Sequence, residues 1–354
     1  MKFESNYSWL DRLLHRLAFA TPRLQIDFAE SEDRKFENLP LQPPLFVTGL
    51  PRAGTTLLLN CLAGLDEFAA HSYRDMPFVL VPQLWSRVSL GFQKPEERME
   101  RAHGDGMTVG TDSPEALEEM LWLAFFPQRY AGDRIKPWPD SADLTGFKPF
   151  FANHMRKIAE LRRPGLRARY VSKNNLNISR IGALAKAFPD ADIVVPFRSP
   201  LQHASSLLRQ HRNFLELHSR DAFARAYMAG VGHFDFGANL KPIDFDGWLE
   251  RSACRDPMTI EFWLAYWIST YRHVLEHNRE RVILVSHDKL CAEPIAQLRR
   301  LAVQLRLSDA ESFVAQAAAI NGASPRPVDQ AGISDALLGE ALALMEELNA
   351  AAYG

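Results

Sequence analysis

The 354-residue sequence is poor in cysteine and contains no long apolar run. Its three cysteines, Cys61, Cys254 and Cys291, lie far apart. They provide neither a disulfide framework nor a metal-binding pattern, and they predict a reducing compartment. No stretch approaches the roughly 20 apolar residues that span a bilayer. Charged residues interrupt the segment 9–20, which is not the pattern of a signal peptide. We therefore expect a cytoplasmic protein.

A strong excess of charge of one sign is also missing. The chain has 41 Lys and Arg against 43 Asp and Glu, which gives a formal net charge of −2. This balance gives no global attraction to nucleic acid or to an anionic membrane, so we expect no nucleic-acid partner, and any anion-binding site has to be local. The lack of a long apolar run predicts no insertion into a membrane. Hydrophobic residues make up 47%, as in ordinary globular proteins, so a chain of this length can bury a substantial core.

The N-terminal end has the pattern of an amphipathic helix over residues 8–20. Ser8 is a suitable N-cap. Apolar residues that share one face are Trp9, Leu10, Leu13, Leu14 and Leu17. We expect residues 1–43 to form a helical extension packed on the core, and residues 44–354 to form a single α/β domain. Helical or loop insertions are expected at about 90–165 and 211–257.

Short apolar runs alternate with helical patterns along the rest of the chain. Predicted strands are Leu45–Val47, Arg169–Ser172 with Lys173 at its end, Ile193–Phe197 and Val282–Ser286. Predicted helices are Leu57–Leu62, Ala116–Phe126 with a start at Ser113-Pro114-Glu115, Ile178–Phe188 and Thr259–His277. This alternation predicts a three-layer α/β/α fold with a central parallel sheet.

The most informative segment joins the first strand to the first helix. It reads Thr48-Gly49-Leu50-Pro51-Arg52-Ala53-Gly54-Thr55-Thr56. A glycine-containing turn from strand to helix presents backbone N–H groups and a helix N-terminus to a phosphate. Gly49 and Gly54 have the spacing of the P-loop motif G-x-x-x-x-G-K-[ST]. However, Thr55 replaces its lysine, and the positive charge comes from Arg52. We predict an anion-binding loop in a fold of the P-loop nucleotide-binding type.

Two more basic residues stand at the ends of predicted parallel strands, where open α/β sheets bind ligands. Lys173 ends one strand and Arg198 follows another. Ser206 lies eight residues after Arg198, about two turns into the helix that Ser199-Pro200 opens. Arg198 offers a two-pronged donor for a phosphate and Ser206 adds a hydroxyl. The sequence therefore predicts two anion sites on one sheet edge.

These motifs together resemble those of the sulfotransferases, closely so for the bacterial branch, over about residues 44–310. The segment from His287 to Pro294 is similar to a late motif of the same family. The resemblance implies transfer of a sulfuryl group from 3′-phosphoadenosine 5′-phosphosulfate (PAPS) to a hydroxyl or amine, without a metal. It implies that the 5′-phosphosulfate is held by Pro51, Arg52, Ala53, Gly54, Thr55 and Thr56.

The same resemblance assigns the remaining donor contacts. Arg198 and Ser206 match the family's 3′-phosphate motif, and Lys173 corresponds to a lysine near the transferred group. Lys173 and Arg52 are thus candidate catalytic residues, because preorganised cations stabilise charge on a leaving oxygen. Arg326, in a Pro-rich loop near the C-terminus, is a further candidate for closing over the 3′-phosphate.

The residue at the expected position of the general base differs from that in one branch of the family. Cytosolic sulfotransferases have a catalytic histidine two residues after the lysine, and this chain has Asn175 there. Other branches use a glutamate or histidine soon after the helix that follows the phosphate loop. In the corresponding segment, residues 71–78, Asp75 is the first candidate for the base and His71 the second.

Two other functions compete with this interpretation. A P-loop kinase or NTPase needs a lysine after Gly54 and a magnesium-binding aspartate at a strand end, a role for which only Asp288 is placed. A non-catalytic nucleotide-binding protein that keeps the fold is the second alternative. The acceptor is expected to contact the segments 76–165 and 211–257, which show no recognisable motif. A small molecule, a carbohydrate and a peptide all stay open.

Overall fold

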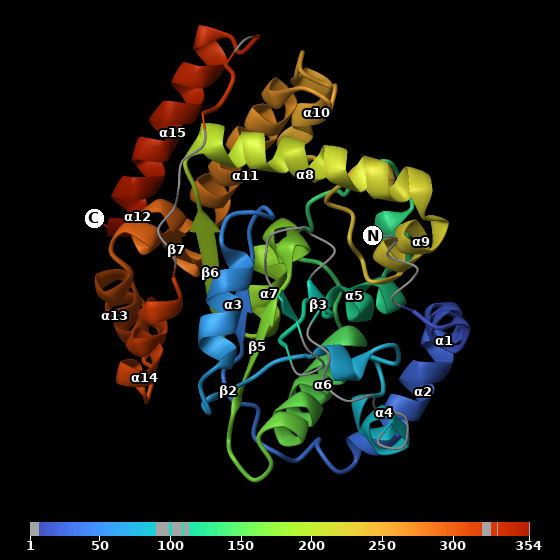
Figure 1. Ribbon diagram of the computed structural model, residues 1–354. Coiled ribbons are helices and arrows are strands. Elements are labelled where there is room, and N and C mark those ends of the chain that lie inside the picture. Colours follow the sequence, from blue (N-terminus) through green and yellow to red (C-terminus); the bar gives the residue numbers. More distant parts are fainter. Residues whose placement is uncertain are drawn as a thin grey trace.

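The computed structural model describes residues 7–89, 113–320, 327–330 and 332–353, and the backbone of two short strands, Met99–Glu100 (β3) and Thr108–Val109 (β4). Within this part of the chain, strands and helices alternate as the sequence predicts (Figure 1). No helix that it describes is both long and apolar enough to cross a membrane.

A five-stranded parallel sheet forms the centre of the molecule, with the strand order β2-β5-β1-β6-β7. The strands are β1 (Leu45–Val47), β2 (Phe68–Ala69), β5 (Arg169–Lys173), β6 (Asp192–Phe197) and β7 (Ile283–Ser286). The four predicted strands are thus confirmed, whereas β2 is too short to give a sequence pattern. Val47 pairs with Lys173 on one side and Val194 on the other. The ends of β5, β1 and β6 therefore lie next to one another.

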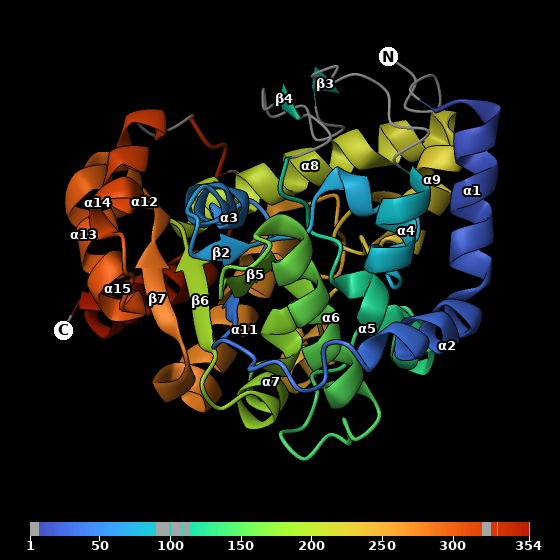
Figure 2. The same cartoon turned by 90° about the horizontal axis from the view of Figure 1, so that it is seen from below.

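Helices cover both faces of this sheet (Figure 2). Leu45 and Val47 face a core made with α3 (Thr55–Ala63), α13 (Pro294–Leu305) and α14 (Ala310–Ala315). Phe46 points to the other face and contacts Phe151 and Phe188. Helices of that second layer are α6 (Phe147–Arg162), α7 (Ile181–Ala187), α11 (Ile260–Asn278) and α15 (Asp335–Tyr353). The predicted three-layer α/β/α fold is therefore confirmed.

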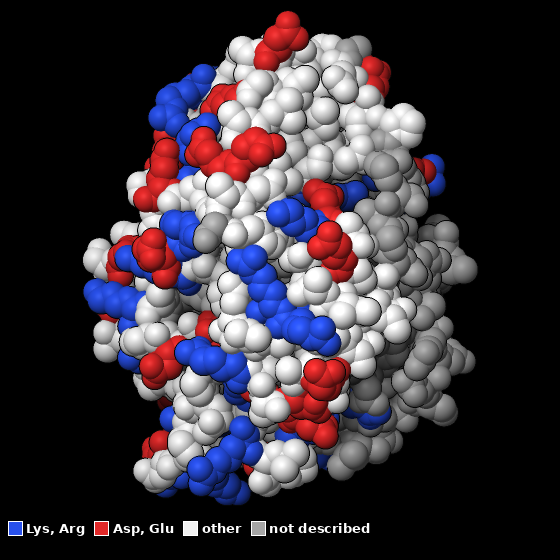
Figure 3. Space-filling model, turned by 90° about the vertical axis from the view of Figure 1, so that its left-hand side faces the viewer, with Lys and Arg blue, Asp and Glu red and all other residues white. Residues whose placement is uncertain are grey.

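The remaining helices flank these layers. They are α1 (Trp9–Ala20), α2 (Pro22–Asp33), α4 (Pro82–Ser89), α5 (Glu119–Phe125), α8 (Pro200–Arg220), α9 (Ala222–Gly230), α10 (Trp248–Arg251) and α12 (His287–Ala292). On the face that carries α13 and α14, acidic and basic side chains are interspersed (Figure 3). This agrees with the small net charge, because no wide field of one sign covers that face.

The N-terminal helices dock through a different face from the one that the leucines suggest. Ser8 caps α1 through a capping box with Asp11, as its position predicts. Yet Trp9 is 70% exposed, and the buried residues of α1 are His15 and Ala18. In α2, the carbonyl of Ala29 accepts a hydrogen bond of 2.7 Å from the buried Lys157 of α6. Small and polar residues therefore make this contact, and the division of the chain near residue 44 stays a prediction.

The segment that begins with Ser113 is extended and not the first turn of a helix. Pro114 pairs with Ser72 in an isolated antiparallel bridge, and the N–H of Glu115 donates to the carbonyl of His71 at 2.9 Å. The helix α5 starts only at Glu119. The helix predicted at Ile178–Phe188 is likewise divided, into a 3₁₀ turn at Asn175–Arg180 and α7. In the first case, backbone pairing with a distant segment outweighs a local capping signal.

Candidate active site

The loop after β1 has the backbone of an anion-binding turn. Arg52 has φ +71° and Gly54 has φ +96°, both in the left-handed region. Gly54 is the N-cap of α3, and no side chain caps that helix. The first N–H groups of α3 are therefore directed to the space in front of the loop. A Cβ at position 54 would lie 2.5 Å from Cδ2 of His287, so this position needs glycine both for its φ and for space.

A histidine of α8 fixes the same loop from the other side. The Nε2–H of His203 donates to the carbonyl of Pro51 at 2.8 Å. Burial lowers the pKa of His203 to about 3, which keeps its ring neutral. The loop therefore has its geometry set by two neighbouring elements, α8 and the start of α12.

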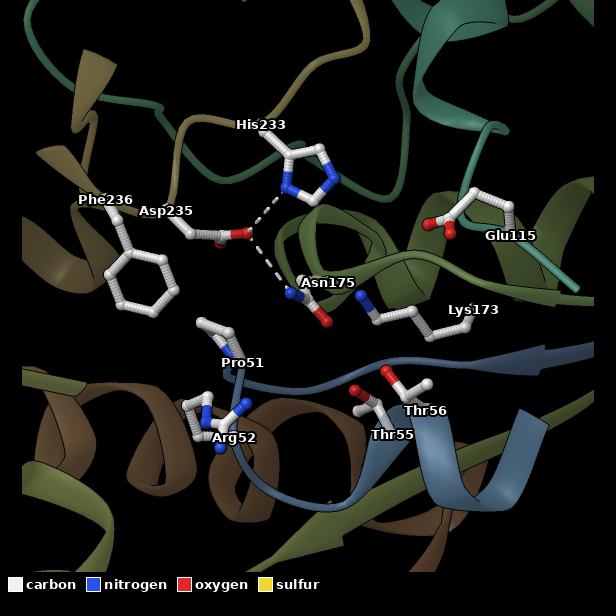
Figure 4. Close-up of a pocket in the computed structure, with 10 residues that line it drawn as sticks. All are labelled: Pro51, Arg52, Thr55, Thr56, Glu115, Lys173, Asn175, His233, Asp235 and Phe236. Carbon is white, nitrogen blue, oxygen red and sulfur yellow. Dashed lines mark hydrogen bonds and ion pairs between the residues drawn. The ribbon is translucent and has the colours of Figure 1, made fainter. Parts of the chain in front are cut away.

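A pocket opens in front of the loop and is lined from four parts of the chain (Figure 4). Its lining residues are Pro51, Arg52, Thr55, Thr56, Glu115, Lys173, Asn175, His233, Asp235 and Phe236. Lys173 is the last residue of β5 and lies between Glu115 and the two threonines (Figure 4). The strand register explains this position, because Lys173 pairs with Val47 one residue before the loop begins.

The far wall of the pocket carries an acid held by polar neighbours. The side-chain amide of Asn175 donates to Oδ2 of Asp235 at 3.2 Å, and Nδ1 of His233 lies 3.9 Å from the same oxygen. Burial raises the pKa of Asp235, and the charge of Lys173 partly opposes this effect. Asn175 thus positions Asp235.

The second predicted anion motif lies beside the first. Nε of Arg52 donates to Oγ of Ser206 at 3.4 Å, so residues 154 positions apart in the sequence meet. Nε of Arg198 is buried and has no hydrogen-bond partner among the described residues. Burial lowers the pKa of Arg198, while the nearby Asp288 raises it. Such an arginine is suited to an anion that would satisfy the remaining donor.

Asp75 and His71, the expected bases, are buried and are not among the residues that line this pocket. Asp75 accepts hydrogen bonds from Ser72 N–H at 3.0 Å and from Arg162, and it lies 3.1 Å from Nδ1 of His71. Burial raises the pKa of Asp75, but His71 and Arg162 outweigh it and the net shift is downward. The catalytic role of this pair stays a prediction.

Five lining residues are not among the site residues that the sequence predicts: Glu115, Asn175, His233, Asp235 and Phe236. Glu115 belongs to the Ser-Pro-Glu triplet, whose pattern is that of a helix start. His233 and Asp235 lie in a glycine- and aromatic-rich segment that has no motif spacing. Arg326, the candidate for closing over the 3′-phosphate, lies outside the described residues.

The fold is shared with a solved structure of a known protein. Sulfotransferase STF9 from Mycobacterium avium is 16% identical, with a TM-score of 0.54 over 93% of this chain and 82% of its own. Sulfotransferase STF1 from Mycobacterium tuberculosis is 14% identical, with a TM-score of 0.48 over 98% of this chain and 86% of its own. No curated protein matches the sequence significantly. The model of the sulfotransferase family matches residues 43–235, more than half of the chain. The chain therefore belongs to the sulfotransferase family.

Proposed function

We propose that the protein transfers a sulfuryl group from PAPS to a hydroxyl or amine of an acceptor, without a metal. The observation that carries this proposal is the contact between Arg52 and Ser206, which joins two anion-binding motifs at one sheet edge. One motif alone would suit any phosphate. Two motifs side by side suit a ligand with two separated anionic groups, such as the 5′ and 3′ groups of PAPS.

The residues present fit such a ligand. The N-terminus of α3 has no side-chain cap, and Nε of Arg198 has no hydrogen-bond partner among the described residues. Both features leave donors that an anion would satisfy. In this proposal the segment from Pro51 to Thr56 holds the 5′-phosphosulfate, and Arg198 and Ser206 hold the 3′-phosphate.

When bound, PAPS supplies the sulfuryl group, and negative charge develops on the oxygen that leaves it. Lys173 and Arg52 line the same pocket from two sides, so their charges are directed at that region. Together with the N–H groups of α3 they would stabilise the developing charge without reorganising, which is the largest contribution in many transfer reactions. The remaining contribution of the chain is to hold the two reactants in line.

We propose Glu115 as the general base. Its carboxylate lines the pocket beside Lys173 (Figure 4), and its Oε1 accepts a hydrogen bond of 3.0 Å from the N–H of Ala116. The carboxylate of Asp75 is buried and does not line the pocket, and it accepts hydrogen bonds from Arg162 and from the N–H of Ser72. The hydrogen bond from Glu115 N–H to the carbonyl of His71 fixes its backbone at the pocket edge. The His71–Asp75 segment would then position the base and not remove the proton itself. His233, beside Asp235 on the far wall, is the competing base.

The kinase alternative finds less support in the same geometry. Thr55 stands in place of the P-loop lysine. Oδ2 of Asp288 accepts a hydrogen bond of 2.7 Å from the N–H of Ser199, so this carboxylate anchors the start of α8. The acceptor, whether small molecule, carbohydrate or peptide, stays open, and a cytoplasmic location stays a prediction.

Calorimetric titration with 3′,5′-adenosine bisphosphate in the presence of EDTA tests the donor site. We expect binding without metal, a loss of binding in Arg198→Ala, and weaker binding of ATP. Arg220→Ala is the matched control, because Arg220 is exposed and lies at the C-terminal end of α8, whereas Arg198 directly precedes the N-cap of this helix. Failure to bind the bisphosphate, with ATP binding that magnesium restores, would contradict the proposal and favour a kinase.

A further inference from the structure

A second group of chemically reactive side chains lies on α11, away from the pocket. His273 and His277 stand four residues apart on this helix, and Asp246 lies opposite them in the 3₁₀ turn Phe245–Gly247. One ligand atom from each residue lies within 4.8 Å of the other two. The helix leads through a short turn into the start of β7, so the group is at the opposite sheet edge from the phosphate loop.

The distances within this group fit one metal ion. A tetrahedral zinc ion with bonds of about 2.0–2.1 Å places neighbouring ligand atoms about 3.3 Å apart. Oδ2 of Asp246 lies 3.3 Å from Nδ1 of His273. The rings of His273 and His277 have centroids 4.6 Å apart, and His277 is exposed, so a change of its rotamer meets little resistance. The three ligand atoms can therefore converge without a change of the backbone.

The backbone of Asp246 and the packing of His273 hold two of the three groups in place. Asp246 has φ +52° and ψ +24°, a left-handed conformation that directs the chain into α10. The ring of Phe245 packs on His273 with centroids 4.5 Å apart. An ordinary ion pair with Asp246 needs only one imidazole. The second imidazole, on the same face of the helix, completes a set of three ligands.

We propose that Asp246, His273 and His277 bind one divalent transition-metal ion of the zinc type, with water in the fourth position. Two imidazoles and one carboxylate favour zinc, cobalt or nickel over magnesium and calcium, which prefer oxygen ligands. The ion would join α11 to the segment 211–257, which also carries His233 and Asp235 of the pocket wall. Its role is thus to stabilise that segment, and the site stands independently of the proposed transferase activity.

Cobalt titration of the metal-stripped full chain, without an affinity tag, tests this site. We expect visible absorption typical of tetrahedral cobalt, saturation at one ion per chain, and displacement by zinc. Asp246→Gly removes the carboxylate but keeps a residue that adopts positive φ, so this variant should fold. His277→Ala removes an exposed ligand. Each change is expected to weaken metal binding at least about tenfold.

Glu276→Gln is the matched control, because it changes a carboxylate of the same helix outside the set. This variant should bind cobalt as the unchanged chain does. Zinc should raise the melting temperature of the unchanged chain and of this control, but not of the two ligand variants. The proposal would be overturned if the unchanged chain showed no saturable cobalt binding. It would also be overturned if Asp246→Gly and His277→Ala bound cobalt as tightly as the unchanged chain does.

Discussion

The two walls of the pocket are built in different ways. The phosphate-binding wall comes from Pro51, Arg52, Thr55 and Thr56 of one continuous segment, and from the end of a neighbouring strand. The opposite wall takes Glu115 from an extended segment before α5, and His233 and Asp235 from a turn after α9. The first wall offers backbone donors from one continuous loop, which α8 and α12 support from outside, and the second offers side chains that only tertiary contacts bring together. A change in each wall should therefore have a different kind of effect.

The largest effect is expected from Gly54→Ala. The new Cβ would need a left-handed φ and would lie 2.5 Å from the ring of His287, so the N-terminus of α3 has to move. We expect calorimetry to detect no bisphosphate binding. Gly64→Ala, at the C-cap of the same helix, is the control. Its φ is −69° and a Cβ there has only ordinary contacts, so binding should persist. Normal binding by Gly54→Ala would show that the loop is not the donor site.

A smaller but still large effect is expected from Glu115→Gln in the opposite wall. Loss of a general base lowers kcat by about 10²–10⁴-fold. Bisphosphate affinity should stay unchanged, because Lys173 lies between Glu115 and the two threonines of the phosphate loop (Figure 4). The measurement is steady-state sulfuryl transfer to an acceptor found by screening. If His233→Gln has the larger effect on kcat and Glu115→Gln has little, His233 is the base.

The same contrast explains how far the sequence predicts the structure. The four predicted strands and the phosphate loop follow from patterns within a dozen residues, and the parallel sheet then places Lys173 and Arg198 at one edge. Ser113-Pro114 is a strong local signal for a helix start and so predicts that Glu115 is helical, but the pairing of Pro114 with Ser72 makes that segment extended. His233 approaches Asp235 and Asn175 only through the path of a turn that has no periodicity.

The N-terminal helix shows the same limit for packing. Its leucines give a clear helical pattern, and the helix and its cap form where predicted. The pattern does not predict which face of the helix packs against the rest of the protein. In the structure the buried side chains of this helix are His15 and Ala18. Amphipathicity therefore predicts the element more securely than it predicts the contact.

The interpretation of Asp75 as a positioning residue predicts an effect on stability. Asp75→Ala leaves Arg162 and His71 without their buried partner, and breaking such a pair costs about 3–5 kcal/mol. The lowered pKa of Asp75 also predicts how the free energy of unfolding changes with pH. The stabilisation is present above the pKa of the unfolded chain and is lost as pH falls through the lower folded value. Urea unfolding at several pH values measures both.

The neighbouring pair Arg163–Asp66 is the control for this experiment. Its atoms are 3.6 Å apart, and the side chain of Asp66 is 88% exposed. Asp66→Ala should therefore change the free energy of unfolding by no more than about 1 kcal/mol. Equal effects of the two substitutions would show that the His71–Asp75–Arg162 contacts do not support the segment that carries Glu115.

The smallest expected effect concerns His287, whose ring lies beside Gly54 in the phosphate-binding wall. Burial lowers the pKa of His287, but its contacts with Asp288 and Cys291 outweigh this and the net shift is upward. Its positive charge beside Gly54 should favour anion binding below the raised pKa and be lost as pH rises through it. Partly exposed charge pairs contribute about 0–1 kcal/mol, so bisphosphate affinity should fall by less than tenfold. In His287→Gln, the pH dependence of bisphosphate affinity should no longer include the titration of this histidine and should reflect that of the ligand. If the affinity of this variant has the same pH dependence as that of the unchanged chain, the phosphate-binding wall works through backbone donors and arginines alone, and His287 serves only to shape the loop.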